Sequence, residues 1–578
     1  MRPPVAIPSR DEYPGSEFYE ITMLERSWQF HRDLGRTTTW GYWATDPSNR
    51  AKPIGLGYLG PTIIAHRNNP VVVNYRNHLP TTHLFQDKVD EMRRQGIAHG
   101  LPDGVNVPTT VHYHGGFTPP HSDGMAPQWY TPDGIHGPDY ATLDEVQSNE
   151  AIYGYGNDHE AFGSWYHDHA MAVTRLNVYA GLAAVYLLRD NVEKGLNLPQ
   201  DEFEVPLILQ DKTFSRDGTL LYTLQEQDGG ETAVVNGKAY PFLAVEPRRY
   251  RLRILDASNS RFWRLCFDVD GRGKLPFWLI STDDGRMPAP LQLTSILLAP
   301  AERADVIIDF SRLPMGTKVT LANDAPVHFP NGGGPEIPEL MQFQVTEPLS
   351  SKDRTTPPTA LVLPPRKRLK PTPGIPRREF TIIQQFPEEH GEMYDPENPY
   401  LINALPFAAP NEDFIQVGTT EIWEYINLTH DAHPMHNHLV QFQVYNRQRF
   451  NRDAYLAAYL EWVDGGREPA AKPVLAEYLV GDPIPPRPDE AGPKDTVQAH
   501  VGLVTRIIQR FDVPGGIEGI PDSGTTLPAR YMHHCHILEH EDNDKMRPWE
   551  IVARPSARER LQEVVEGALD EVGTVLGR

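Results

Sequence analysis

The stretch YMHHCHILEHE (residues 531–541) sets one cysteine, Cys535, between two histidines and adds a third histidine, His540, five residues further on. Residues i and i+2 of a strand point to the same face, so His534 and His536 share one face and Cys535 takes the other. Imidazole and thiolate are ligands that suit copper, and two histidines with one cysteine are typical of a blue-copper site. The stretch therefore predicts a strand whose two faces serve two copper sites only a few bonds apart.

Three more pairs of histidines, each separated by one residue, lie upstream. They are His112/His114, His167/His169 and His436/His438, and His433 precedes the last pair by three residues. Together with His534, Cys535, His536 and His540, these clusters contain ten of the 23 histidines and one of the two cysteines. Tetrahedral zinc is the alternative metal, but ten histidines exceed what one structural zinc needs, and zinc has no redox chemistry. Buried structural histidines do not explain why the clusters fall only in the first and last thirds of the chain.

The composition favours many short strands and turns. The 578 residues include 55 prolines and 45 glycines, and strand-like runs such as 203–212 and 304–310 recur between turn signals. This pattern is typical of β-sandwiches or barrels, and the length predicts about two to four domains. The domains are predicted at 1–190, 200–347 and 379–553, with a proline-rich, basic linker at 348–378 between the last two.

Two segments have helical patterns. Residues 455–464 predict a short helix inserted between strands of the last domain. Residues 554–578 predict a C-terminal amphipathic helix, in which Leu561, Val565 and Leu569 lie on one apolar stripe. This helix either docks on its own chain or forms the contact of a homo-oligomer.

Charge and cysteine content exclude several classes of protein. The formal net charge of −23 argues against nucleic acid or an anionic membrane surface as partner. Cys266 and Cys535 are the only cysteines, so a disulfide framework is excluded. No apolar run reaches transmembrane length, and the N-terminus lacks the apolar core of a secretory signal. These features predict a cytoplasmic protein.

Longer motifs resemble the three-domain multicopper oxidases, in pattern closest to the group of bacterial spore-coat laccase, bilirubin oxidase and phenoxazinone synthase. The motifs that carry the resemblance span nearly the whole chain: LGPTI (59–63), LPTTHL (79–84), VHYHGGFTPPHSDG (111–124), WYHDHAMAVTRLNVYAGLAAVYLL (165–188), HPMHNHLVQFQV (433–444), KDTVQAHVG (494–502) and HCHILEHEDNDKMRP (534–548). The resemblance implies an all-β fold of three consecutive cupredoxin-like Greek-key β-sandwiches. It also adds association with a spore coat as an alternative location.

The resemblance assigns the histidine clusters to four copper ions. It implies a type 1 copper at His433, Cys535 and His540, a type 2 copper at His112 and His436, and two type 3 coppers at His114, His167, His169, His438, His534 and His536. Electrons from a small aromatic reductant would enter at the type 1 copper and reduce dioxygen to water at the trinuclear cluster. Phenols, aminophenols and bilirubin-like pigments are the expected reductants.

Two carboxylates match positions that this family uses to deliver protons. Reduction of dioxygen to water consumes protons, so an acid is needed near the cluster. Glu541 directly follows His540, and Asp123 lies nine residues after His114. Without the resemblance, Asp123 is equally well interpreted as a turn residue before Gly124.

The sequence departs from the family at the axial position of the type 1 copper. Relatives have a methionine ten residues after the cysteine, whereas this chain has Lys545 there, followed by Met546. Three interpretations remain open: Met546 shifts into the axial site, the site has no axial protein ligand and Lys545 turns away, or a neutral Lys545 amine binds copper.

Two other functions remain alternatives. An oxidase of cuprous or other metal ions is disfavoured because the 12 methionines form no cluster that would collect Cu(I). A copper-binding structural protein with an impaired type 1 site is supported only by Lys545.

Overall fold

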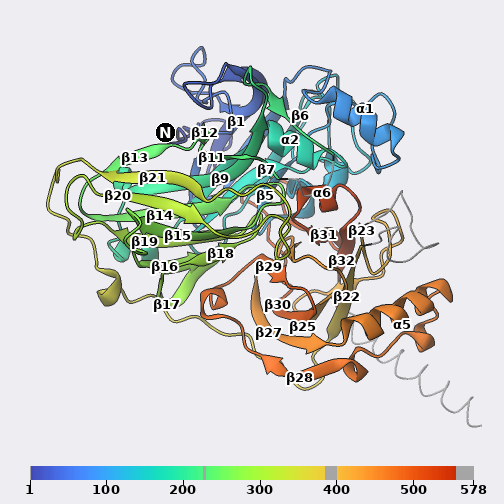
Figure 1. Cartoon of the computed structure of the whole chain (residues 1–578). Helices are drawn as coiled ribbons and strands as arrows, with labels where there is room; N and C mark the ends of the chain where they lie inside the picture. Colours follow the sequence, from blue (N-terminus) through green and yellow to red (C-terminus); the bar gives the residue numbers. More distant parts are fainter. Residues whose placement is uncertain (1, 225–228, 385–399, 555–578) are drawn as a thin grey trace, which may run out of the picture.

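The computed structural model describes residues 2–224, 229–384 and 400–554, and the statements below concern these residues. Strands dominate and form six sheets, which pack as three pairs around separate apolar cores. The pairs follow one another along the chain, blue to cyan, green to yellow and orange to red in Figure 1. The predicted all-β class with three sandwiches is confirmed.

The first sandwich carries the first two histidine pairs. One sheet has the order β2 (Thr37–Ala44), β1 (Glu17–Trp28), β4 (Val71–Asn77) and β6 (Glu150–Tyr155), and the other has the order β3 (Ile63–His66), β8 (Ala183–Arg189), β7 (Phe162–Asp168) and β5 (Val111–His114). Its helices are α1 (Gln86–Arg94), α2 (Thr174–Ala180) and α3 (Asn191–Gly195). Aromatic side chains such as Trp40, Tyr42 and Tyr166 are fully buried between the sheets, as the alternating pattern of half-buried strands requires.

The second sandwich contains none of the predicted copper ligands. Its larger sheet has the order β12 (Lys238–Ala239), β11 (Thr232–Val235), β9 (Glu204–Phe214), β14 (Arg249–Asp256), β19 (Arg303–Asp309), β16 (Phe277–Thr282) and β17 (Gly285–Leu293), with β10 (Leu220–Leu221) beside β9. Its smaller sheet has the order β13 (Phe242–Val245), β21 (Glu339–Val345), β20 (Lys318–Asn323), β15 (Trp263–Val269) and β18 (Ile296–Leu298). Cys266 lies in β15 and is buried, as expected for a small apolar side chain.

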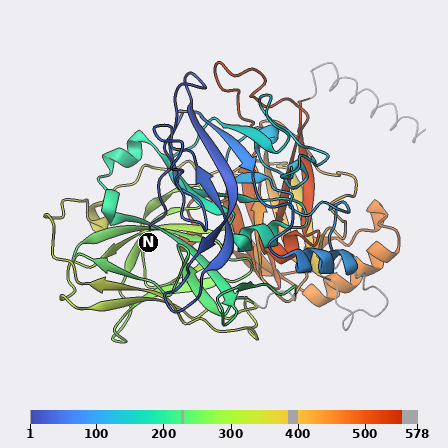
Figure 2. The ribbon, with the colours of Figure 1, turned by 90° about the horizontal axis from the view of Figure 1, so that it is seen from above.

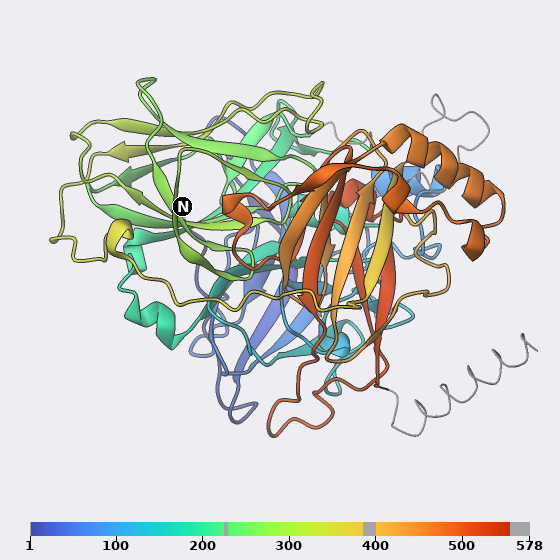
Figure 3. The same ribbon diagram turned by 90° about the horizontal axis from the view of Figure 1, so that it is seen from below.

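The third sandwich carries the remaining histidine clusters. One sheet has the order β23 (Tyr400–Ile402), β22 (Arg377–Gln384), β25 (Thr420–Asn427), β30 (Leu503–Arg510), β27 (Phe442–Phe450) and β28 (Leu479–Ile484), and the other has the order β24 (Phe414–Gln416), β32 (Met546–Val552), β31 (Ala529–Cys535), β26 (His433–Asn437) and β29 (Thr496–Ala499). The helix predicted at 455–464 lies within α5 (Arg452–Asp464), which packs Tyr455 and Tyr459 on the outside of the first of these sheets (Figure 3).

The first and third sandwiches meet directly, and the second lies beside both (Figure 2). At the meeting point α2 contacts α6 (Leu538–Glu541), and the backbone N–H groups of Thr174 and Arg175 donate to the Asp542 carboxylate at 3.2 and 2.9 Å. The segment 348–378 runs over the surface from the second sandwich to the third; before β22 begins at Arg377 it contains one short 3-10 turn, Pro358–Ala360. The junction of the first and third sandwiches is therefore the place where ligands from both ends of the chain can meet.

Two further predictions concern membranes and the C-terminus. None of the helices in the described ranges is long and apolar enough to span a membrane. The C-terminal helix predicted at 554–578, and the oligomer contact predicted through it, lie outside the described residues except for Arg554.

Candidate copper centre

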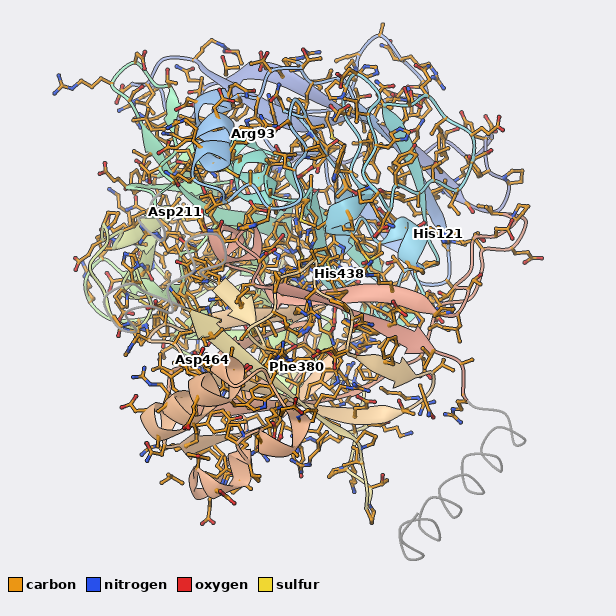
Figure 4. The ribbon with its side chains drawn as sticks, turned by 90° about the vertical axis from the view of Figure 1, so that its right-hand side faces the viewer. Arg93, His121, Asp211, Phe380, His438 and Asp464 are labelled. Atoms are coloured by element: carbon orange, nitrogen blue, oxygen red, sulfur yellow. The ribbon has the colours of Figure 1, made fainter. Side chains whose placement is uncertain are left out.

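Strand register brings the histidine pairs together. β5 and β7 are antiparallel with His112 opposite His167, and β26 and β31 are antiparallel with His436 opposite His534. Cross-strand partners share a face of the sheet, so each register gathers histidines on one side. Figure 4 shows His438 where the blue elements of the first sandwich meet the orange-to-red strands of the third. All ten clustered histidines and Cys535 are at most 1 % exposed, so the ligands form a fully buried centre.

The ligand atoms fall into groups of three, each within 4.8 Å of one another. The groups are His114/His167/His536, His169/His438/His534, His433/Cys535/His540 and His112/His114/His436. The structure thus brings all eleven predicted ligands into metal-sized groups, three of which adjoin one another between the first and third sandwiches. The assignment of the residues to individual copper ions stays a prediction.

The inward-facing nitrogens have the chemistry of metal ligands. The Nδ1 atoms of His112, His167 and His436 face backbone carbonyl oxygens at 2.6, 2.8 and 2.9 Å. Their Nε2 atoms point inward and have no hydrogen-bond partner among the described residues. Burial is the main reason that the pKa values of these rings lie far below normal, to about 3 for His112, and neighbouring histidines contribute to the shift. Neutral imidazoles with unpartnered, buried lone pairs fit a bound metal and are costly without one.

Between them, Asp123 and Glu541 contact all three histidines of the group His169, His438 and His534. Asp123 Oδ2 is 2.6 Å from Nδ1 of His438, and the two Glu541 oxygens are 3.1 and 3.0 Å from Nδ1 of His169 and of His534. Burial raises the pKa of Asp123 to about 8, although the Thr118 hydroxyl that donates to it opposes this shift. A carboxylate on the outer nitrogen of a ligating imidazole fixes its orientation and strengthens it as a ligand.

Asp495 is a further residue of this centre, and the sequence analysis assigned it no role. His114 Nε2 donates to Asp495 Oδ1 at 3.0 Å, and the Asp495 backbone oxygen accepts from His436 Nδ1. Asp495 lies within the motif KDTVQAHVG, but only the fold brings it to His114, which is 381 positions away in the sequence. Thr429 was also missed, although it lies only four residues before His433, and its hydroxyl lies 2.7 Å from His433 Nε2.

The candidate type 1 site is formed by Cys535 and two imidazoles. Nδ1 of His433 and Nδ1 of His540 each lie 3.6 Å from Cys535 Sγ. The Tyr400 ring stacks on the His540 ring, with centroids 4.6 Å apart and planes 18° apart. Burial raises the pKa of the Cys535 thiol to about 12, with Lys545 opposing the shift. Metal binding at this thiol must therefore displace a proton.

Lys545 faces this site, whereas Met546 does not. Lys545 Nζ lies 3.4 Å from Nδ1 of both His433 and His540, and it lies over the Tyr400 ring. Met546 is buried in the core of the first sandwich. The prediction that Met546 takes the axial position is therefore wrong, and so is the prediction that Lys545 turns away. Of these two side chains, it is Lys545 that lies beside the imidazoles of His433 and His540.

The geometry defines a protein with a buried centre for several metal ions, and comparisons with known proteins identify its family. Residues 378–554 match the multicopper oxidase family. The chain is 38% identical to a laccase of Bacillus subtilis over 92% of this chain and 94% of that protein. It is 39% identical to a laccase of Bacillus stratosphericus over 95% and 98%, and 35% identical to a multicopper oxidase of Arabidopsis thaliana over 92% and 88%.

Solved structures share the fold. A laccase from Pediococcus acidilactici superposes with a TM-score of 0.67 at 24% identity and covers 95% of this chain and 93% of its own. A multicopper oxidase from Aquifex aeolicus gives the same score at 23% identity, with 96% and 100% covered. The chain belongs to the multicopper oxidase family, and it is a copper-dependent oxidoreductase with dioxygen as acceptor.

Proposed function

We propose that this protein takes single electrons from small aromatic reductants, such as phenols and aminophenols, and passes them through Cys535 to dioxygen. One observation carries the proposal: Cys535 faces His433 and His540, while its chain neighbours His534 and His536 face the other histidine groups. Copper, when bound, would supply one-electron chemistry at the cysteine site and reduction of dioxygen to water at the histidine groups. The donor set supports four ions, one of type 1, one of type 2 and two of type 3.

The protein side chains position ligands and hold protons in this scheme. Asp123 and Glu541 are buried against Nδ1 atoms of one histidine group, so each orients its imidazoles and is placed to hold a proton there. Tyr400, itself buried, stacks on His540 and makes the surroundings of the candidate type 1 site apolar. Water would otherwise compete for the metal and screen the electrostatic interactions inside the site.

Size supports single-ring reductants over larger pigments. A cavity of about 130 Å³ lies beside Glu539, the residue that precedes His540, and is lined by Tyr179, Tyr222 and Asn259 among others. A tetrapyrrole would exceed this volume, whereas one aromatic ring would fit against the two tyrosines. Tyr222 and Asn259 both donate to Oε1 of Glu539, at 2.7 and 3.0 Å, which fixes the carboxylate at the cavity wall.

Oxidation of a metal ion is the second candidate. Glu539 Oε2 has no hydrogen-bond partner among the described residues, and Asp211 lines the same cavity. Carboxylate oxygens would suit a hard cation better than Cu(I), which favours sulfur ligands. Because both candidates use this cavity, the variant Glu539→Gln separates them: it removes the negative charge that a cation needs and keeps the space that an aromatic ring fills, so metal oxidation should fall and phenol oxidation should stay unchanged.

The experiment that tests the proposal combines spectra and turnover on copper-loaded protein. Visible absorption and EPR spectra are recorded together with oxygen uptake on a simple phenol, for the natural chain and for Cys535→Ser. We expect an intense blue band, narrow hyperfine splitting and oxygen uptake from the natural chain, and loss of all three from the variant. A natural chain that binds copper but is colourless and consumes no oxygen refutes the proposal.

A further inference from the structure

A residue of the second sandwich reaches the centre although that sandwich supplies no predicted ligand. Arg303 begins β19, is 5 % exposed, and donates from both terminal nitrogens to the Asp495 carboxylate, at 2.8 Å for the longer contact. Its remaining donors bind the backbone oxygens of Gly163, Ala301 and Asp283, at 3.2, 3.0 and 3.0 Å. One guanidinium thus binds all three sandwiches, and its bidentate geometry fixes the orientation of the carboxylate as well as its position.

Asp495 in turn decides which nitrogen of His114 faces inward. His114 donates to Asp495 through Nε2, so Nδ1 carries the inward lone pair, and Nδ1 has no hydrogen-bond partner among the described residues. His112 and His436 are turned the other way, with Nδ1 toward the protein. The hydrogen bond to the outer nitrogen sets the tautomer of a ligating imidazole. His114 is therefore presented correctly only while the Asp495 carboxylate stays in place.

The backbone beside His114 is packed against the same cluster. Gly115 has φ of +78°, and a Cβ there would lie 2.6 Å from Asp495 Oδ2 and 2.9 Å from a terminal nitrogen of Arg303. Real Cβ atoms do not approach other atoms this closely, so the chain after His114 leaves room only for glycine. The position of Asp495 is thus constrained from the backbone of the first sandwich and from the guanidinium of the second.

We propose that Arg303 is a positioning residue for the histidine group His112, His114 and His436, and that it acts by holding Asp495. The inference rests on the proposed binding of copper by this group. It gives the second sandwich a role in copper retention: its Arg303 links the two sandwiches that supply ligands and orients one imidazole at their junction.

The test compares Arg303→Gln and Arg303→Lys with the matched control Arg251→Gln. Arg251 lies in β14 of the same sheet, is 4 % exposed, and makes an equivalent bidentate bond to Asp305, with Nε at 2.9 Å and a terminal nitrogen at 2.6 Å. The measurements are copper per chain during chelator titration, the type 2 EPR signal, the blue band and thermal unfolding.

We expect Arg303→Gln to bind the copper held by His112, His114 and His436, a group of one predicted type 3 ligand and both predicted type 2 ligands, roughly 10- to 100-fold more weakly, because loss of an outer partner of a ligand costs about that much affinity. The blue band should persist, since the contacts of Arg303 among the described residues do not include His433, Cys535 or His540. Arg303→Lys should retain the copper more tightly than Arg303→Gln but with altered EPR hyperfine splitting. Arg251→Gln should lose thermal stability and keep a natural EPR spectrum.

Natural copper content and EPR spectrum in Arg303→Gln would overturn the inference, and so would an equal copper loss in Arg251→Gln. If Arg303→Gln fails to fold and has no blue band, Arg303→Lys decides: an unaltered type 2 spectrum overturns the inference and an altered one supports it. Failure of the proposed function is distinguishable, because the natural chain itself would then be colourless and consume no oxygen, whereas the inference is decided by the copper retention and EPR spectra of the variants.

Discussion

Replacing Lys545 by leucine should lower the reduction potential of the type 1 copper. Lys545 Nζ is 3.4 Å from both imidazole nitrogens of the candidate site and is buried. Burial is the main cause that holds the pKa values of His433 and His540 well below normal, and the charge of Lys545 is the second. Reduction removes one positive charge from the metal, so a nearby ammonium group favours the reduced state. Removing that group should therefore favour Cu(II).

The magnitude follows from Coulomb's law. Two unit charges at the 3.4 Å separation of Lys545 Nζ from the ligand nitrogens interact by about 5 kcal/mol when the effective dielectric constant is about 20. For a one-electron couple, about 1.4 kcal/mol corresponds to about 59 mV. Lys545→Leu should thus lower the potential by up to about 200 mV. Lys545→Met should lower it at least as far, because a weak thioether ligand also stabilises Cu(II) slightly.

The assay is a spectroelectrochemical titration of the blue band in the natural chain, Lys545→Leu and Lys545→Met. The two variants separate the effect of the charge, which both lose, from the effect of an axial sulfur, which only one gains. An unchanged potential in Lys545→Leu would show that Lys545 exerts no electrostatic effect on the metal. A higher potential in both variants would refute the reasoning, because it would mean that a neutral Lys545 amine binds and stabilises Cu(II).

Three other outcomes are expected. Asp123→Asn and Glu541→Gln should slow oxygen uptake by roughly 10²- to 10⁴-fold, the usual contribution of a positioned acid, while the blue band and the type 1 potential stay natural. The pKa of His83 falls to about 4, mainly because the side chain is buried. Its Nδ1 accepts a hydrogen bond from the Phe85 N–H. The unfolded chain therefore binds a proton at higher pH than the folded chain, so stability is lost as the pH falls from about 6.5 toward 4. This loss should be roughly 3 kcal/mol, and His83→Gln should flatten it in urea unfolding at several pH values. Gly115→Ala should lower both the thermal midpoint and the copper content, since the new methyl group meets Asp495 and Arg303; a natural copper content would contradict this.

The local pattern of the sequence was sufficient for the fold class and for most of the centre. Strand periodicity of two places both members of a His-X-His pair on one face, and antiparallel register then sets His112 opposite His167. Neither step needs knowledge of the rest of the chain. The three sandwiches could be inferred from the recurrence of short strands, and the absence of ligands from the middle of the chain agreed with a centre between the first and the third.

Residues that act from a distance could not be predicted in this way. Arg303 and Asp495 are 192 positions apart and belong to different sandwiches. Nothing in the strand that Arg303 begins distinguishes it from Arg251, which lies in the same sheet and binds Asp305. The difference between a structural ion pair and one that positions a ligand arises only when the sandwiches are docked.

The side on which Lys545 lies follows from the register of two strands. In the pairing of β31 with β32, Met546 lies opposite His534, and cross-strand partners share a face. Met532, His534 and Met546 therefore point toward the first sandwich, where both methionines are buried in its core. Lys545 comes one residue before Met546, so its side chain points to the opposite face, which is also the face of Cys535. The Cys535 N–H donates to the backbone oxygen of Lys545 at 3.0 Å. Met546 could enter the copper site only by a slip of one residue, which would turn every side chain of β32 to the opposite face. The register of the sheet, rather than the chemistry of the axial position, is what brings a lysine to the metal.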